Sequence, residues 1–232
     1  MIIHDIIYLS LLGIGVLSLA IFYFMLGKSP GKLPDGWKKT TLPLKRFRIS
    51  ILFLMIYLLV NLIGEIVAIN LARHGIYNSF VISINETLAT PFLFGFLFIH
   101  TQTWWKRYIY ALLYLVIVIY FIQGGYYHPS CVLPSFSALL FFSTYFLATL
   151  VHLTDLLVNP KSEYFKFQLK VNISILICTL LATMFTSFAW SDNNSDPFYS
   201  ELFFYIHFYN IVAFHLSLDL IFLFEILKLR RG

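Results

Sequence analysis

Charged residues are scarce in this sequence. Asp, Glu, Lys and Arg make up 12% of its 232 residues, whereas a soluble domain contains about 25%. Hydrophobic residues make up 59% and aromatic residues 19%. A chain of this composition would expose a large apolar surface to water. The composition therefore excludes a soluble globular protein and predicts that the lipid bilayer covers the surface.

Cysteine is also scarce, and long polar segments are missing. Cys131 and Cys178 are expected at different depths in the membrane, which disfavours a disulfide between them, and their spacing is not that of a metal site. The longest polar segment, residues 28–48, is too short to fold alone. We interpret it as an irregular segment at the membrane surface. The chain is therefore expected to form a single transmembrane domain over residues 1–232, without a soluble catalytic domain.

The sequence does contain seven long apolar runs. A hydrocarbon core of about 30 Å requires roughly 20 helical residues, whereas the strands of a membrane barrel need only about 9–11 and alternate in polarity. The predicted fold class is therefore all-α, a polytopic membrane protein with seven transmembrane helices. These helices are predicted over residues 6–26, 49–72, 80–100, 105–123, 135–158, 171–190 and 202–227.

Lys and Arg are concentrated in alternate gaps between these runs. Fifteen of the sixteen lie in residues 28–48, 104–108 and 159–170 and in the C-terminal tail, and the other gaps hold only Arg73. Cytoplasmic loops collect basic residues, so the pattern predicts an outside N-terminus and a cytoplasmic C-terminus, in a bacterial inner membrane. The formal charge of +5 then indicates contact with anionic lipid and with a cytoplasmic protein partner. No nucleic acid partner is expected.

A short turn joins the second and third predicted helices. Gly75 is expected to end the second helix in the left-handed conformation. The two helices would then be antiparallel neighbours. Glu65 and Glu86 each lie about ten residues from the middle of the turn, which places them at one level, roughly 10 Å below the outer surface at 1.5 Å per residue.

Polar residues in the outer half form the first candidate site. Placing an ionisable side chain in the hydrocarbon core costs about 3 kcal/mol or more, so each such residue is expected to have a partner or a function. His207 lies about six residues into the last predicted helix, at a depth similar to that of Glu65 and Glu86. The candidate ligand-binding residues are Glu65, Glu86, His207, Asn61, Asn85 and Tyr209, and the metal candidates among them are Glu65, Glu86 and His207. The alternative is that each residue satisfies its own structural hydrogen bond.

A second polar set lies toward the cytoplasm. It consists of His152, Asp155, His215, Asp219 and Asn172. Together the two sets would line a path across the membrane, because histidine can exchange protons near neutral pH. The alternative is local pairing. Asp155 would then pair with Lys166 or Lys170, and Glu225 with Lys228 or Arg48.

Three functions are consistent with this pattern. The leading hypothesis is a sensory or signalling module that binds a small ligand or ion in an outward-facing cavity between helices 2, 3 and 7. A proton-coupled transporter or channel is the second, and a metal-dependent intramembrane enzyme is the third. The sequence leaves open whether the protein is an enzyme. A divalent cation is the candidate cofactor, and retinal is not expected, because Lys228 lies beyond the end of the last helix.

Two segments resemble a diffuse group of bacterial seven-helix integral membrane proteins. The first is Asn61-Leu62-Ile63-Gly64-Glu65 with His74-Gly75-Ile76-Tyr77-Asn78-Ser79-Phe80, and the second is Leu169-Lys170-Val171-Asn172-Ile173-Ser174-Ile175. The chain departs from the group at Asn85-Glu86, where an aromatic and a small polar residue are usual. The resemblance implies a membrane module of sensory type and supplies no activity.

Overall fold

Seven helices make up the computed structural model of this chain. It describes residues 2–28, 41–76, 79–99, 101, 103–122, 134–158, 165–191 and 197–231, and some side chains within these ranges lie outside the description. The described residues contain no strand, so the all-α prediction is confirmed. The helices are α1 (Ile2–Lys28), α2 (Thr41–Arg73), α3 (Ser79–Phe98), α4 (Trp104–Ile122), α5 (Pro134–Val158), α6 (Phe165–Ser191) and α7 (Pro197–Arg231).

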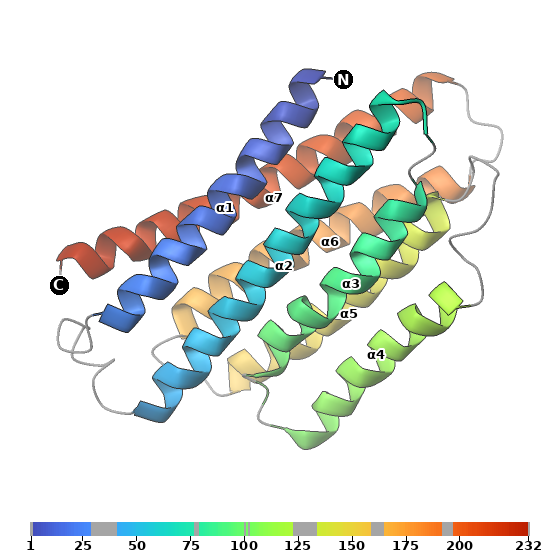
Figure 1. Cartoon of the computed structure of the whole chain (residues 1–232). Coiled ribbons are helices and arrows are strands. Elements are labelled where there is room, and N and C mark those ends of the chain that lie inside the picture. The colour runs from blue at the N-terminus through green and yellow to red at the C-terminus, as the bar shows by residue number, and fades with distance from the viewer. Residues whose placement is uncertain are drawn as a thin grey trace.

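The helices pack in two layers, each in chain order (Figure 1). One layer contains α1, α2, α3 and α4, and the other contains α5, α6 and α7. Successive helices run antiparallel. The layers join where α1 packs on α7 and where α5 packs on α3 and α4. The predicted antiparallel pairing of helices 2 and 3 is confirmed, since α2 packs extensively on α3.

Four helices, α1, α2, α6 and α7, begin four or more residues earlier than predicted, and the extensions of α2 and α6 are the longest. α2 begins at Thr41, so residues 41–48 are helical and the prediction of an irregular segment is wrong for them. Pro43 lies in the first turn, where its missing N–H breaks no intrahelical hydrogen bond. Residues 29–40 lie outside the described part. α6 begins at Phe165, before the predicted start at residue 171.

The end of α2 matches its prediction. Gly75 has a φ of 70°, which glycine adopts without steric penalty. The Ile76 N–H donates to the Leu71 carbonyl across 2.9 Å, and the Gly75 N–H donates to the Ala72 carbonyl across 3.0 Å. These are the two hydrogen bonds of a Schellman motif, which satisfies carbonyls at the helix end and turns the chain sharply.

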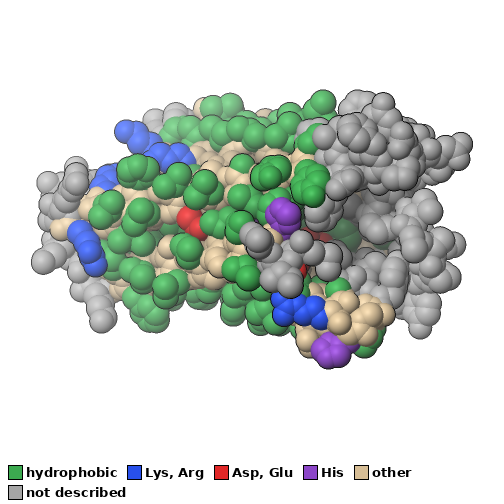
Figure 2. Space-filling view, turned by 90° about the horizontal axis from the view of Figure 1, so that it is seen from above, with side chains coloured by type: hydrophobic (Ala, Val, Ile, Leu, Met, Phe, Trp, Pro, Cys, Tyr) green, Lys and Arg blue, Asp and Glu red, His purple; other side chains and the backbone are tan. Residues whose placement is uncertain are grey.

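The surface is that of a multi-pass membrane protein. Five helices contain stretches long and apolar enough to cross a bilayer: His4–Gly27, Leu44–Arg73, Leu139–Val158, Phe165–Met184 and Phe208–Lys228. α3 has a shorter apolar stretch, Ile84–Phe98. Figure 2 shows hydrophobic side chains over most of the described surface of one face. Lipid therefore covers the molecule, while the number of crossings, predicted as seven, stays a prediction.

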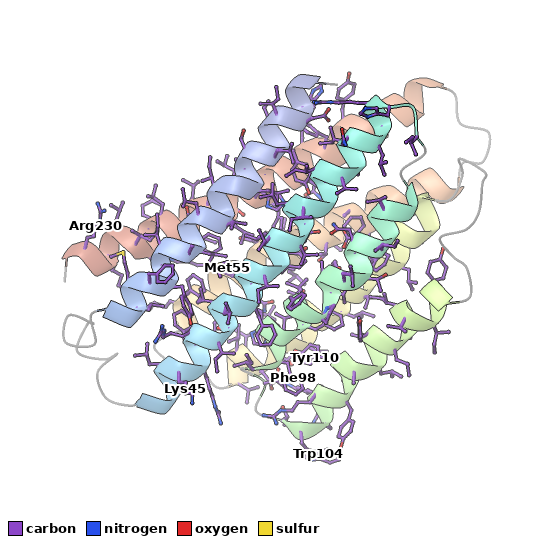
Figure 3. The ribbon with its side chains drawn as sticks, viewed as in Figure 1. Lys45, Met55, Phe98, Trp104, Tyr110 and Arg230 are labelled. Carbon is purple, nitrogen blue, oxygen red and sulfur yellow. The ribbon has the colours of Figure 1, made fainter. Side chains whose placement is uncertain are left out.

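Basic side chains gather at one end of the bundle, which we call the basic end. It is formed by the end of α1, the start of α2 and the corresponding ends of the other helices. Figure 3 shows Lys45, Trp104 and Arg230 toward this end and Met55 near the middle of α2. Among the described basic residues, only Arg73 lies at the opposite end. This arrangement is the one that the charge pattern predicts for antiparallel helices.

Four phenylalanine side chains pack together in the bundle interior near the basic end. They come from four helices: Phe22 from α1, Phe47 from α2, Phe167 from α6 and Phe222 from α7. Each is at most 2% exposed. Ring centroids lie 5.3 Å apart for Phe47 and Phe167 and 6.2 Å apart for Phe167 and Phe222. The Phe47 and Phe167 rings meet edge to face at 89°, and the Phe167 and Phe222 rings are tilted by 32°. Aromatic contacts of both kinds add to the stability of the packing. We call these residues the aromatic cluster.

Candidate functional site

Two asparagines join α2 to α3. The Asn85 side-chain N–H donates to Oδ1 of Asn61 across 3.1 Å, and the Asn61 side-chain N–H donates to the Tyr57 carbonyl across 2.9 Å. Both asparagines are less than 9% exposed. Gly64 allows this contact, because a Cβ at that position would overlap the Asn85 amide. The structure thus brings together two of the predicted ligand-binding residues in a buried pair.

Glu86 is held by a residue that the sequence analysis missed. The Tyr145 hydroxyl of α5 donates to Glu86 Oε2 across 2.9 Å. The same hydroxyl lies 2.7 Å from Thr90 Oγ1, which is also 2.6 Å from the Glu86 carbonyl. A signal was present in the sequence, since a tyrosine inside an apolar run needs a partner for its hydroxyl.

Glu65 differs from Glu86 in its surroundings. It is half-buried, and it forms no hydrogen bond or ion pair with any described residue. It lies within electrostatic range of Glu86 and of Asp5 on α1. The Tyr8 phenol, also on α1, lies within the same range of both glutamates. Glu65 therefore has one carboxyl neighbour on α3 and another on α1, toward the end opposite the basic end. We call Asp5, Glu65 and Glu86 the acidic cluster.

The predicted contribution of helix 7 is not seen at this cluster. Tyr209 is 61% exposed on the outer surface of α7. The main packing partners of α7 are α1 and α6, so α1 and α5 adjoin the α2–α3 pair instead. The side chain of His207 lies outside the described residues. Among the side chains that are described, no group of three or more His, Cys, Asp and Glu residues is arranged to hold a metal ion.

Asp155 has a different partner from the one predicted. Lys106, at the start of α4, donates to Asp155 Oδ1 across 2.6 Å, and both residues are buried. Thr103 and Thr154 add hydrogen bonds to Asp155 and to Lys106. The prediction of Lys166 or Lys170 was wrong, because α4 lies on α5 and carries its lysine inward. For Glu225, the predicted pairing with Lys228 is present at 4.0 Å, and Lys170 is nearer at 3.3 Å.

A buried polar group lies beside this ion pair, between α5 and α6. His152 and Asn172 are 0% exposed and Gln168 is 1% exposed. The Asn172 side-chain N–H donates to the Thr149 carbonyl across 3.3 Å. His152 is one turn from Thr149 on α5, and Gln168 is one turn from Asn172 on α6, so the four residues share one helix interface. Both ring nitrogens of His152 lack a hydrogen-bond partner in the structure.

His215 and Asp219 lie on the other side of α6. The His215 ring packs on Tyr8 of α1 with 5.4 Å between ring centroids. Asp219 points at Gly15 of α1, where a Cβ would lie 3.0 Å from Asp219 Oδ1. The residues of the predicted inner path therefore fall into three groups. Asp155 lies between α4 and α5, His152 and Asn172 lie between α5 and α6, and His215 and Asp219 lie between α7 and α1.

Comparison with protein families, with curated proteins and with solved structures found no match for this chain.

The acidic cluster is rich in hydrogen-bond acceptors. Carboxylate oxygens are acceptors and attract positive charge, and the Tyr145 hydroxyl fixes the orientation of one of them. The Glu65 carboxyl accepts no hydrogen bond from a described residue, so its oxygens remain available as acceptors. The buried asparagine pair beneath fixes the spacing of α2 and α3.

Proposed function

We propose that this chain is a membrane-embedded sensory or signalling module that binds a small cationic ligand or ion at the acidic cluster. The proposal depends on the surroundings of Glu65. This side chain is half-buried within electrostatic range of a second carboxyl, and it forms no hydrogen bond or ion pair with a described residue. Like charges brought together in a medium of low polarity repel one another. A bound cation removes this repulsion, so the apo cluster favours such a ligand.

The contacts around the acidic cluster hold α3 against α5 and against α2. Glu86 is anchored to α5 through Tyr145, and the asparagine pair fixes α2 against α3. Asp5 adds a carboxyl from α1. A cation bound here contacts three helices at once, so its binding can change how α1 packs on α2. A cation that binds one packing arrangement of α1 and α2 more tightly than another shifts the protein toward that arrangement, as a signalling response requires.

The two ends of the molecule suit different tasks under this proposal. With the N-terminus outside, the acidic cluster faces the exterior half of the bilayer and the basic end faces the cytoplasm. Exposed Lys45, Arg46 and Lys166 at the basic end suit anionic lipid and an acidic surface of a cytoplasmic partner. The buried aromatic cluster links α1 and α2 to α6 and α7 and would transmit a shift of α1 to that end.

Ligand-dependent stability tests this proposal. The full chain in detergent is unfolded by heat in the presence of calcium, manganese, zinc, choline or ethanolamine. A cation at one hundred times its Kd should stabilise the fold by about 2.7 kcal/mol. Glu65→Gln and Glu86→Gln should each lose most of this effect. Glu225→Gln is the matched control, because its carboxyl lies near the basic end and pairs with Lys170.

The result that contradicts the proposal is equally specific. If no cation in the series stabilises the protein, or if both glutamine variants respond as the unchanged chain does, the acidic cluster is not a ligand site. The thermal midpoint of each variant without added cation shows whether the substitution itself harmed the fold.

A proton-coupled transporter is the second candidate, and the buried pair His215 and Asp219 favours it. The aromatic cluster weighs against an open passage along α1, α2, α6 and α7. Proteoliposomes with an imposed pH gradient test this alternative. Transport predicts that the gradient decays faster with the unchanged chain than with Asp219→Asn, and equal decay would reject it.

A further inference from the structure

Asp219 of α7 lies near the midpoint of the apolar span Phe208–Lys228, whereas the charge pattern of the sequence had placed it toward the cytoplasmic end. It is eleven residues from the start and nine from the end of the span Phe208–Lys228. At 1.5 Å per residue, it is about 14 Å or more from either end. Gly15 and Leu58, which surround the same point, also lie near the midpoints of their spans His4–Gly27 and Leu44–Arg73. Three helices thus place this carboxyl at one central level.

The surroundings of Asp219 contain no compensating charge among the described residues. Asp219 is 8% exposed, and Oδ2 is buried without a hydrogen-bond partner. None of the ion pairs between described residues includes Asp219. The nearest lysine on α7, Lys228, is two and a half turns away at 3.6 residues per turn. An ionised carboxylate at this depth is unfavourable, so the group requires a bound positive species or a functional reason.

The packing keeps this carboxyl in place. Gly15 on α1 leaves the space that Asp219 fills, since a Cβ there would lie 3.0 Å from Oδ1 and 3.2 Å from Leu58. His215 is one turn away on the same face of α7, and its ring packs on Tyr8 of α1. The titratable groups near Asp219 are therefore His215 on its own helix and Tyr8 on α1. Tyr57 on α2 and Cys178 on α6 lie within electrostatic range of Tyr8.

We infer that Asp219 is a second binding site, for a small monovalent cation, held between α1, α2 and α7 at the centre of the membrane. The occupant is a proton or a sodium ion, since either one neutralises a single carboxylate and is small enough for a site packed against the α1 backbone. His215 is a positioning residue, because it shares the face of Asp219 and fixes α7 against α1. The site is separate from the acidic cluster and stands whether or not that cluster binds a ligand.

Chemical labelling with dicyclohexylcarbodiimide tests this inference. The reagent enters from lipid and reacts with protonated carboxyl groups, and mass spectrometry identifies the modified residue. In the full chain in proteoliposomes, Asp219 should be modified. Well above the titration point, the rate should fall about tenfold for each unit rise in pH, following the protonated fraction. Asp219→Asn should lose modification at this position and keep the same labelling elsewhere.

Sodium distinguishes the two occupants. If sodium at fixed pH slows the labelling of Asp219 and choline does not, sodium is the occupant. If only pH matters, the occupant is the proton. The inference is overturned if Asp219 stays unmodified at every pH while the unfolded chain reacts, or if its labelling responds to neither pH nor sodium.

Two variants and one control distinguish an effect on the Asp219 site from a general loss of stability. Gly15→Ala places a methyl group against Oδ1 and should change the labelling rate of Asp219 at least about twofold, by the contact geometry. Gly13→Ala meets nothing within 4 Å and should leave that rate unchanged. His215→Phe keeps a ring against Tyr8 and removes the nitrogens. It should shift the pH profile of labelling while the thermal midpoint stays close to that of the unchanged chain. An unshifted profile would remove His215 from the site.

Discussion

The Tyr145 hydroxyl of α5 donates to Oε2 of Glu86 on α3 across 2.9 Å, which ties the two helix layers together beside the acidic cluster. Thr90 Oγ1 lies 2.7 Å from the same hydroxyl, so one phenol contacts two side chains of α3. A hydrogen bond between helices in a membrane is worth about 0.6 kcal/mol on average and up to about 1.7 kcal/mol. The contact is therefore a modest contribution to stability and a larger one to the orientation of the Glu86 carboxyl.

Tyr145→Phe should destabilise the fold by about 1 kcal/mol, because it leaves a partly buried carboxylate oxygen without its donor. It should also weaken cation binding at the acidic cluster. Unfolding of the purified chain by SDS measures the first effect. Tyr108→Phe is the control, since Tyr108 is 66% exposed. Equal losses in the two variants would contradict a specific role for Tyr145.

Gly64→Ala should destabilise the fold by about 1–3 kcal/mol, as overpacking of a close contact does. The added methyl group would overlap the Asn85 amide and push α3 from α2. Gly13→Ala is the matched control on α1, where a methyl group meets nothing within 4 Å. This control should be neutral or stabilising by up to about 1 kcal/mol through helix propensity. Thermal unfolding of both variants checks the difference, and a neutral Gly64→Ala would show that α2 and α3 are spaced differently.

Lys106→Met should destabilise the fold by about 3–5 kcal/mol, because Asp155 would be left buried and unpaired. Adding Asp155→Asn to this variant should recover much of the loss, since the uncompensated charge is then removed. Lys45→Met at an exposed position of the basic end is the control. Denaturation curves of the single and double variants supply the comparison. A double variant less stable than Lys106→Met would argue against a buried ion pair.

The orientation of the chain can be tested with single cysteines. In a background of Cys131→Ser and Cys178→Ala, Arg73→Cys should react with a membrane-impermeant maleimide added to intact cells. Lys45→Cys should react only after the cells are permeabilised. Both positions are exposed and lie at opposite ends of the bundle. The reverse labelling pattern would invert the orientation that the basic residues predict.

The acidic cluster illustrates how far the sequence could predict the site. The pairing of α2 with α3 followed from the short turn, because two helices joined by a few residues must lie side by side. The third helix at the site did not follow. Apolar positions surround α1, α5 and α7 alike, so the sequence offered no means to decide which of them adjoins α2 and α3. His207 and Tyr209 were chosen by depth, and Tyr145 was missed because depth does not report rotation about the helix axis.

The sequence by itself determined the helical class, the membrane environment, the left-handed Gly75 that ends α2, and the charge pattern from which orientation is predicted. These depend on composition and on residues that are near one another along the chain. Only the tertiary structure decided that Lys106 pairs with Asp155, that Tyr145 holds Glu86, and that Asp219 faces Gly15 rather than His152. Those choices depend on which helices are neighbours and how each is rotated. Both are set by close packing of side chains across the whole bundle.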